Sequence, residues 1–446
     1  MLDLLFSLIE RPVIWASHLR KSERTKATAR SQGLGREVDT GHAFEITAED
    51  LARHCYILGS TGCGKTTFIL QLLKHDIEAE RSVVVIDLRG DLVAATLGLC
   101  ASLNLDPTRV TLLDLRETAK VQGFNPLSGA GEPYIRALHL LDVLSQEAPS
   151  WGVQLEETLR SALLLLASSP EPLTKLNAVL FDDDFRGRCL GQVTDEDVLT
   201  FWERYERFSE DKKVAWAAPV LNKVSPLLAV PILRRVLGSK APLDLEAKLS
   251  SPGHVTLVSL AVDELHRSAR MMGSLLVSAI AREMMARVNM AENRRNPVRL
   301  YVDEFENMAS ESFEGLIAEG RRFKLSLVLS HQTLSQLPAK LRSVIRNNVG
   351  IQIVFQCGFE DAQTIARELP GDFGLTDIRG LGVGEALVMS RDGEVVNVGF
   401  HAPPRRPKNA VVSEFHKRVL EGIASEPESS PARSSSEETL DLEAWI

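Results

Sequence analysis

The segment Gly-Ser-Thr-Gly-Cys-Gly-Lys-Thr at residues 59–66 limits the possible folds more than any other feature of the chain. It matches the pattern G-x-x-x-x-G-K-[ST], and it lies between the apolar run CYIL at 55–58 and the amphipathic run FILQLLKH at 68–75. Glycines let backbone N–H groups turn inward toward phosphates, and a helix N-terminus adds a favourable dipole. We expect a phosphate-binding loop, because an ordinary glycine-rich turn does not explain Lys65 and Thr66 at its end.

The residues of this loop have separate expected roles in holding a nucleoside triphosphate. Lys65 is expected to reach the β- and γ-phosphates, which also makes it a catalytic candidate, and Thr66 is expected to hold Mg²⁺ through its hydroxyl. ATP and Mg²⁺ are therefore the predicted cofactors. The predicted nucleotide-binding set is Gly59, Ser60, Thr61, Gly62, Cys63, Gly64, Lys65, Thr66 and Thr67.

Short apolar runs alternate with helical patterns along most of the chain, and this alternation predicts the fold class. Near-continuous apolar strands separated by helices are typical of an α/β fold with a parallel sheet covered on both faces. The stretch 385–400 indicates a C-terminal β-hairpin, because Asp392-Gly393 is a strong turn signal. The predicted strands of the sheet lie at 55–58, 83–86, 110–113, 255–260, 300–302, 325–329 and 351–355.

The middle of the chain differs, because apolar residues at helical spacing dominate there and strand signals are scarce. The segment WGVQLEETLRSALLLLA at 151–167 is an example, and it indicates an inserted all-helical domain. The last segment is low in apolar residues and is expected to be largely disordered, apart from a short helix at 412–423. The expected divisions are an N-terminal segment and linker at 1–43, a nucleotide-binding domain at 44–133 and 246–402, a helical insertion at 134–245, and an acidic tail at 403–446.

Composition restricts the setting and the partners. The formal net charge is −9, so basic groups would have to be concentrated in one groove or pore if the chain handles nucleic acid. The five cysteines are scattered, which argues against a disulfide framework or a structural zinc site and favours a reducing, cytoplasmic setting. No uncharged apolar run reaches about 18 residues, so no integral membrane anchor is expected. The apolar stretch 1–21 is interrupted by charges, and we expect a packed or partner-binding segment, with peripheral contact at the inner membrane as the alternative.

A second chemical signal is the pair Asp303-Glu304, which directly follows an apolar run. Asp303 is expected to hold the Mg²⁺ shell, and Glu304 is expected to polarise the attacking water. The pair Asp263-Glu264 also follows an apolar run and is the alternative. We prefer the first pair, because acids are favoured in the first turn of a helix, which accounts for Asp263-Glu264 without chemistry.

Two further signals flank the run at 325–329. Gln332, just after it, is the candidate sensor of the γ-phosphate, whereas His331 is expected to be positional. Arg321-Arg322, just before it, has two interpretations. A basic helix end in solvent is one, and an arginine finger supplied to a neighbouring subunit's ATP is the other.

The candidate contacts to DNA lie in the segment AKLRSVIRNNVG at 339–350. Lys340, Arg342 and Arg346 can contact phosphates in a salt-sensitive way that does not depend on sequence. A solvated helix face is the alternative. Aromatic residues make up only 6% of the chain, so base stacking is not expected as the main mode of binding.

Three segments together resemble the HerA–FtsK superfamily of P-loop ATPases: GSTGCGKTT at 59–67, VVVIDLRGDLV at 83–93 and GFNPL at 123–127. The similarity extends over roughly 44–402, and it is closest to conjugative coupling ATPases of the TraG/TraD type and to HerA-like DNA translocases. In that family a second strand ends in Asp-Pro-Lys/His-Gly-Asp, whereas residues 87–91 here are Asp-Leu-Arg-Gly-Asp.

The resemblance implies a RecA-like motor domain, a helical lid domain and a homohexameric ring with DNA in its channel. By the same analogy, Arg321 becomes the finger and Gln332 becomes the sensor. The N-terminal membrane anchor of coupling proteins has no counterpart here, which favours a HerA-like soluble translocase or a mobile-element or defence-associated motor.

Other functions remain open at this point. An ATPase that remodels or exports protein fits the acidic charge, and the tail with Trp445 offers a docking segment for a secretion or nucleoprotein partner. A nucleotide-gated receptor with little turnover is the third interpretation, although Lys65, Thr66, Asp303 and Glu304 together argue against it. A small-molecule kinase also uses a P-loop, but the chain is long for one.

Overall fold

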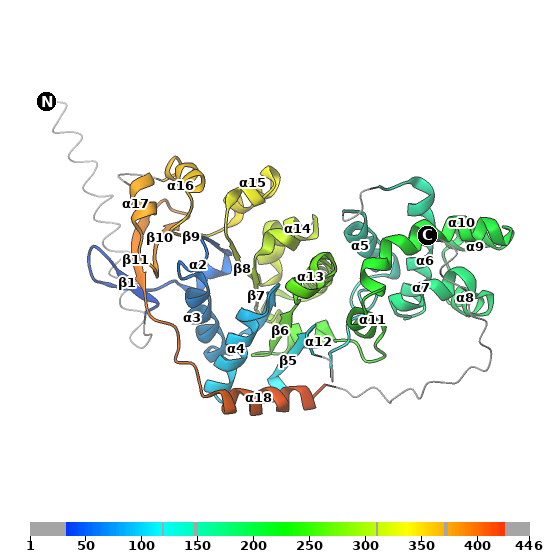
Figure 1. Ribbon diagram of the computed structural model, residues 1–446, viewed down its shortest axis with the longest axis horizontal. Coiled ribbons are helices and arrows are strands. Elements are labelled where there is room, and N and C mark those ends of the chain that lie inside the picture. Colours follow the sequence, from blue (N-terminus) through cyan, green and yellow to red (C-terminus); the bar gives the residue numbers. More distant parts are fainter. Residues whose placement is uncertain (1–32, 118–119, 147–149, 309–310, 370–372, 424–446) are drawn as a thin grey trace.

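The computed structural model describes residues 33–117, 120–146, 150–308, 311–369 and 373–423. Its centre is a sheet whose described strands run in the order β2-β1-β11-β10-β9-β3-β8-β7-β4-β6-β5, with helices on both faces (Figure 1). Strands β9 to β5 in this order pair in parallel, which confirms the predicted fold class. The parallel strands are β3 (Cys55–Leu58), β4 (Ser82–Asp87), β5 (Val110–Asp114), β6 (Val255–Ser259), β7 (Val298–Asp303), β8 (Leu325–His331) and β9 (Ile351–Phe355).

Antiparallel strands extend the sheet beyond β9. The hairpin of β10 (Glu385–Ser390) and β11 (Val395–Phe400) pairs with β9, and Gly393 takes a positive φ of 82° in its turn. Strands β1 (Gly35–Glu37) and β2 (Ala43–Phe44) then follow β11. This corrects the expectation that 1–43 is only a segment and linker. Strand β1 is short and polar because it lies near the edge of the sheet, so its sequence lacks the apolar run that marks the central strands.

Alternate residues of each central strand face opposite layers of helices. Cys55 and Ile57 of β3 pack with the layer of α3, α4 and α18, whereas Tyr56 and Leu58 pack with the layer of α13 to α16. The first layer consists of α3 (Lys65–Glu78), α4 (Asp91–Ser102) and α18 (Asn409–Glu421). The second consists of α13 (Val262–Met285), α14 (Glu311–Glu319), α15 (Ala339–Asn348) and α16 (Phe359–Ala366).

Helix α18 places part of the expected tail in the folded domain. Phe415 and Val419 are buried with residues of α4 and β5, so residues 409–421 are ordered where 403–446 was expected to be largely disordered. The helix begins somewhat before the predicted 412–423, and it buries one apolar stripe that compositional reasoning underrated. The expectations for residues 1–32 and for Trp445 lie outside the described residues.

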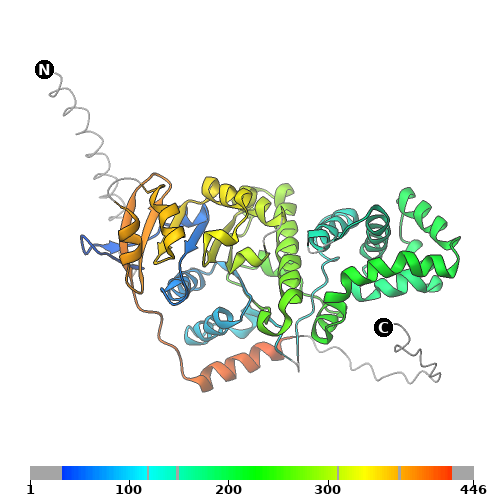
Figure 2. The ribbon, with the colours of Figure 1, turned by 45° about the horizontal axis from the view of Figure 1, so that its top comes forward.

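The helices between β5 and β6 form a bundle beside α13 (Figures 1 and 2). Its two connections to the sheet domain run side by side, because Gly123 and Pro242 form a β-bridge and Leu243 N–H donates to Gly123 O at 2.7 Å. The helices are α5 (Pro133–Gln146), α6 (Val153–Ser168), α7 (Leu176–Phe181), α8 (Asp183–Leu190), α9 (Glu196–Glu206), α10 (Glu210–Leu228), α11 (Pro231–Gly238) and, leading to β6, α12 (Leu245–Ser250). In the described ranges no single helix is long and apolar enough to cross a membrane, and only α10 and α11 pass as a pair, bent by 99°.

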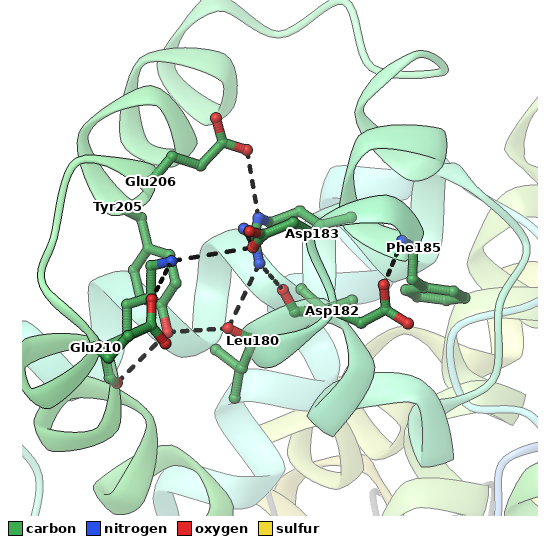
Figure 3. Close-up of polar contacts among 10 residues, drawn as sticks. Leu180, Asp182, Asp183, Phe185, Tyr205, Glu206 and Glu210 are labelled. Carbon is green, nitrogen blue, oxygen red and sulfur yellow. Dashed lines mark hydrogen bonds and ion pairs between the residues drawn. The ribbon is translucent and has the colours of Figure 1, made fainter.

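A buried arginine, Arg186, lies inside this bundle, and Figure 3 shows its partners Asp183 and Glu206. The side chain of Arg186 is fully buried, pairs with Asp183 and approaches Glu206 Oε1 at 3.5 Å. Its guanidinium also donates to Val179 O at 3.1 Å and lies 5.5 Å from the centroid of the Trp202 ring. Because a buried charge is costly unless it is paired and hydrogen-bonded, these contacts hold α7, α8 and α9 in one arrangement.

A second buried ion pair fastens the helix after the P-loop to the sheet. Arg299 Nη1 of β7 lies 2.6 Å from Asp76 Oδ1 of α3, and both side chains are 3% exposed. The Tyr301 hydroxyl donates to Asp76 Oδ2 at 2.6 Å, and Arg299 Nε donates to Ser326 Oγ of β8 at 3.0 Å. This network therefore joins α3, β7 and β8 below the candidate site.

Replacing Asp76 by Ala is expected to lower the free energy of unfolding by about 3–5 kcal/mol, because Arg299 stays buried without its partner. Lys74→Gln on the same helix is the matched control. It removes an exposed pair with Glu78 at 3.7 Å and is expected to cost about 0.5 kcal/mol or less. Urea unfolding followed by circular dichroism measures both, and equal effects would contradict a structural role for the buried pair.

Candidate functional site

The P-loop connects β3 to α3 at the carboxyl-terminal edge of the parallel strands. Gly62 has a φ of 80° and Gly64 a φ of 117°, both in the left-handed region that favours glycine. Gly64 is the N-cap of α3 and makes no side-chain cap, and the first turn of the helix has no acidic residue. The first N–H groups of α3 therefore remain available to an anion.

The hairpin packs directly against this loop. Gly384 N–H donates to Cys63 O at 2.9 Å, and a Cβ at Gly64 would lie 3.1 Å from Gly384 Cα. The thiol of Cys63 is buried and would lie 2.7 Å from a Cβ at Gly59. Small residues thus allow the close packing inside the loop, and the β10–β11 hairpin, which is distant in sequence, packs against its outer side.

Lys65 lies across the loop. Its Nζ donates to Gly59 O at 2.5 Å and to Ser60 O at 2.9 Å, and no described carboxylate pairs with it. The positive charge is therefore available for phosphates. Thr66 follows, exposed, in the first turn of α3. Together with free N–H groups, these residues have the donor chemistry that a nucleoside triphosphate requires.

Asp303 ends β7, and β8 separates it from the P-loop strand. The pKa of Asp303 is raised to about 6, chiefly by burial, with smaller contributions in the same direction from Asp87 and Glu304, whereas Lys65 acts in the opposite direction. Ser330 is its register partner on β8 and also lowers this pKa, although the two groups do not meet hydrogen-bond geometry. A half-buried carboxylate beside other carboxylates fits a cation site. Thr66 and Asp303 would hold Mg²⁺, which binds through few protein oxygens and keeps most of its waters.

Glu304 takes a φ of 51°, which is unusual for a residue with a side chain. Its carboxylate accepts from Gln332 Nε2 at 2.8 Å and from Arg89 Nε at 3.2 Å. Thr61 Oγ1 in turn donates to Gln332 Oε1 at 3.2 Å. A line of side-chain contacts thus runs from the P-loop through β8 to Glu304 and on to the loop after β4, bringing together residues that the sequence proposed separately.

Sequence reasoning missed two members of this region. Arg89 contacts Glu304, and its only sequence signal was the positive charge that the segment 87–91 shares with the HerA–FtsK superfamily. Glu306 has a buried Oε2 with no hydrogen-bond partner among the described residues, and burial raises its pKa to about 7. Nothing in its sequence context marked Glu306.

The alternative acidic pair lies elsewhere. Asp263 and Glu264 are in the first turn of α13 and both pair with Arg116, whose Nε is 3.4 Å from Glu264 Oε1. This helix follows β6, which lies beyond β4 from β7. The structure therefore does not bring Asp263-Glu264 to the P-loop.

Arg321 is at the opposite edge of the sheet from the P-loop. It is exposed in the 3₁₀ turn Gly320–Phe323, directly before β8, whereas Gln332 follows the other end of this strand. Seven strand residues span roughly 23 Å. Arg321 cannot reach the nucleotide site of its own chain, so only a site on another subunit is compatible with a catalytic role.

The three basic candidates on α15 have different surroundings. Lys340 Nζ lies 2.6 Å from Glu314 Oε2, and Arg346 Nη2 lies 2.5 Å from Glu368 Oε1. Arg342 is half-buried and lines a cavity. Exposed ion pairs contribute little to stability, so the pairing of Lys340 does not prevent an exchange of partner.

Comparisons with known proteins agree with this architecture. Residues 35–145 match the family described as the central domain of helicase HerA. The unbound bacterial conjugative coupling protein TrwB has a TM-score of 0.61 at 16% identity, covering 86% of this chain and 93% of that one. Plasmid coupling protein TrwB with ADP and Mg²⁺ gives 0.62 at 14% identity, with coverages of 87% and 93%. VirB4 of Thermoanaerobacter pseudethanolicus gives 0.57 at 13% identity, with coverages of 84% and 98%.

No curated protein sequence matches the chain significantly. At these identities the solved structures establish the shared fold. The resemblance to P-loop ATPases of the HerA–FtsK type and to coupling proteins is confirmed, in sequence over 35–145 and in fold over most of the chain.

Glu304→Gln is expected to lower kcat for ATP hydrolysis by about 10²–10⁴-fold while ATP still binds, because the role expected of this residue is to act on water rather than on phosphate. Steady-state ATPase and equilibrium binding of labelled ATP separate the two effects. Asp263→Asn, in the alternative pair, serves as the control and is expected to keep wild-type hydrolysis. Loss of activity in the control with retention in Glu304→Gln would reverse the assignment.

Proposed function

We propose that this protein is an ATP-hydrolysing motor that assembles as a ring and moves DNA, in conjugative transfer, in a mobile element or in DNA processing. The observation that carries the proposal is the line of contacts Thr61–Gln332–Glu304–Arg89 beside Lys65 and Asp303. This line joins the loops at the ends of β3, β8, β7 and β4. A change at the γ-phosphate would therefore alter contacts at the ends of all four strands. A binding module would not need this connection.

Within the site, each side chain has a task that follows from its position. Lys65 and the N–H groups of α3 bind the phosphates, and Thr66 and Asp303 hold the metal. Mg²⁺, when bound, neutralises charge that develops on the phosphate oxygens. Glu304 orients and polarises the attacking water, and Gln332, bonded to it, registers the γ-phosphate.

A homohexameric ring accounts for Arg321. In a head-to-tail ring, one surface of each subunit meets a different surface of the next. An exposed arginine at the edge away from its own P-loop is then free to enter the neighbour's nucleotide site and stabilise charge in the transition state.

DNA is proposed to contact α15 through Lys340, Arg342 and Arg346. The net charge of −9 restricts such contact to a local surface. The same charge, and the ion pairs of Lys340 and Arg346, favour an ATPase that remodels or exports protein as the second candidate. The two candidates differ in whether DNA changes the rate of hydrolysis.

DNA is expected to stimulate ATP hydrolysis, and higher salt is expected to weaken this effect, because phosphate contacts release counterions. Steady-state ATPase with single-stranded and duplex DNA, at two salt concentrations, measures it. Lys65→Ala is the negative control and is expected to abolish hydrolysis in every condition. Hydrolysis that depends on Lys65 and ignores both forms of DNA would favour the protein-handling function.

Arg321→Ala is expected to lower kcat by about 10³–10⁵-fold if the arginine acts on a neighbour's nucleotide. Mixing it with Lys65→Ala is expected to restore part of the activity, because some junctions then combine an intact Lys65 with an intact Arg321. Two inactive parents that form mixed rings without any recovered hydrolysis would contradict the assignment in trans.

A further inference from the structure

A cavity of about 320 Å³ lies under α15 and α16, on the sheet face opposite α3. Tyr56 of β3 and Gln352 of β9 form part of its wall, and Arg342, Arg346 and Glu368 line its charged side. This space is far larger than a single water requires, so a phosphate and its neighbouring atoms have room in it.

One guanidinium in the wall of the cavity has no partner among the described residues. Arg346 is held by Glu368 Oε1 at 2.5 Å, whereas the guanidinium of Arg342, one turn earlier on the same face of α15, makes no hydrogen bond or ion pair with the described part of the chain. Nearby Asp361 accepts from Leu334 N–H at 3.1 Å. A half-buried guanidinium is costly without an anion, and its planar fork matches two oxygens of a phosphate.

Tyr56 connects this cavity to the candidate catalytic residues. Its hydroxyl is hydrogen-bonded to His331 Nε2, and both side chains are buried. The His331 ring lies 5.2 Å from the Tyr56 ring and 5.3 Å from the Phe305 ring, measured between centroids. His331 directly precedes Gln332, and Phe305 directly follows Glu304. The three rings therefore lie next to the two residues that form the Gln332–Glu304 hydrogen bond.

Arg342 acts on the same hydroxyl. Burial raises the pKa of Tyr56 well above its usual range, and the nearby carboxylates of Asp361 and Glu306 act in the same direction. Arg342 lines the same cavity as Tyr56, and its positive charge acts on this pKa in the opposite direction. An anion on Arg342 would therefore change the electrostatic surroundings of the Tyr56–His331 bond.

We propose that this cavity binds a phosphate of the DNA strand through Arg342, and that the Tyr56–His331 hydrogen bond carries its occupancy to Gln332 and Glu304. The identity of the strand rests on the proposed function. Tyr56 and His331 are positioning residues in this scheme, since they touch the catalytic residues' neighbours and not the nucleotide. The cavity thus links substrate contact with hydrolysis inside one subunit.

The site is tested with Arg342→Gln, and Arg294→Gln is the matched control. Arg294 is exposed in the turn that precedes β7, at the end of the parallel strands opposite the P-loop. A fluorescein-labelled single-stranded oligonucleotide and its duplex serve as probes for anisotropy and ATPase. Arg342→Gln is expected to weaken binding severalfold, to reduce the slope of log K against log salt by about one, and to bring the stimulated-to-basal ratio toward one. Arg294→Gln is expected to keep the wild-type values.

The link is tested with Tyr56→Phe, which keeps the ring and removes the hydroxyl. This variant is expected to bind the oligonucleotides like the wild type and to keep the KM for ATP, while kcat in the presence of DNA falls. A purely structural hydroxyl would change thermal stability without separating DNA binding from stimulation. Wild-type stimulation in Tyr56→Phe would therefore overturn the link.

The remaining outcomes separate this inference from the proposed function. If DNA binds and stimulates, and Arg342→Gln behaves like Arg294→Gln, the cavity proposal is wrong and the motor stands. If DNA does neither, labelled ATP is titrated into Lys65→Ala and into Lys65→Ala with Arg342→Gln. Binding that depends on Arg342 would assign the cavity to a free nucleotide phosphate and refute the DNA motor, and its absence would refute both.

Discussion

Strand β8 fixes the relative positions of the candidate site residues, because it is hydrogen-bonded in parallel to β3 on one side and to β7 on the other. Its register places His331 beside Leu58 of the P-loop strand and Ser330 beside Asp303. The three strands therefore end at one edge of the sheet, and the loops that follow them begin there. A slip of one residue would exchange the two faces of the strand, and would move His331 from its ring contacts. The bond from Arg299 to Ser326, on the network with Asp76, opposes such a slip.

Several acidic groups lie close together at this edge, and their environment shows what they are suited to do. Burial raises the pKa of Asp303 and of Glu306, and Glu304 adds a left-handed backbone that costs about 1–3 kcal/mol. The carboxylate of Asp303 accepts from Glu304 N–H at 3.1 Å, and Asn307 donates to Glu304 O at 3.1 Å, which helps to hold this backbone. Such strain and crowding of carboxylates are expected where a cation and a polarised water are handled.

The sequence predicted the elements whose signals are local. The central strands are apolar runs, and the P-loop and Asp303-Glu304 directly follow such runs. Strand β1 escaped prediction because a short strand next to the edge of the sheet needs no apolar run. The Tyr56–His331 bond joins residues 275 positions apart, and Arg89 meets Glu304 across 215 positions. Contacts of this kind depend on strand order, which no local pattern contains. The order, with β8 between β3 and β7, became known only from the structure.

Strand β8 also connects the edge of the sheet that carries the P-loop with the opposite edge, where Arg321 lies. Arg321 precedes β8 and Gln332 follows it, and the strand between them is buried throughout and paired on both sides. A short strand in a closely packed core moves as a unit and does not bend. In the proposed ring, loss of the γ-phosphate beside Gln332 would therefore be transmitted along β8 to the arginine at the next subunit's nucleotide. Communication between neighbouring sites would then need no separate relay, because the sensor and the finger belong to the same strand.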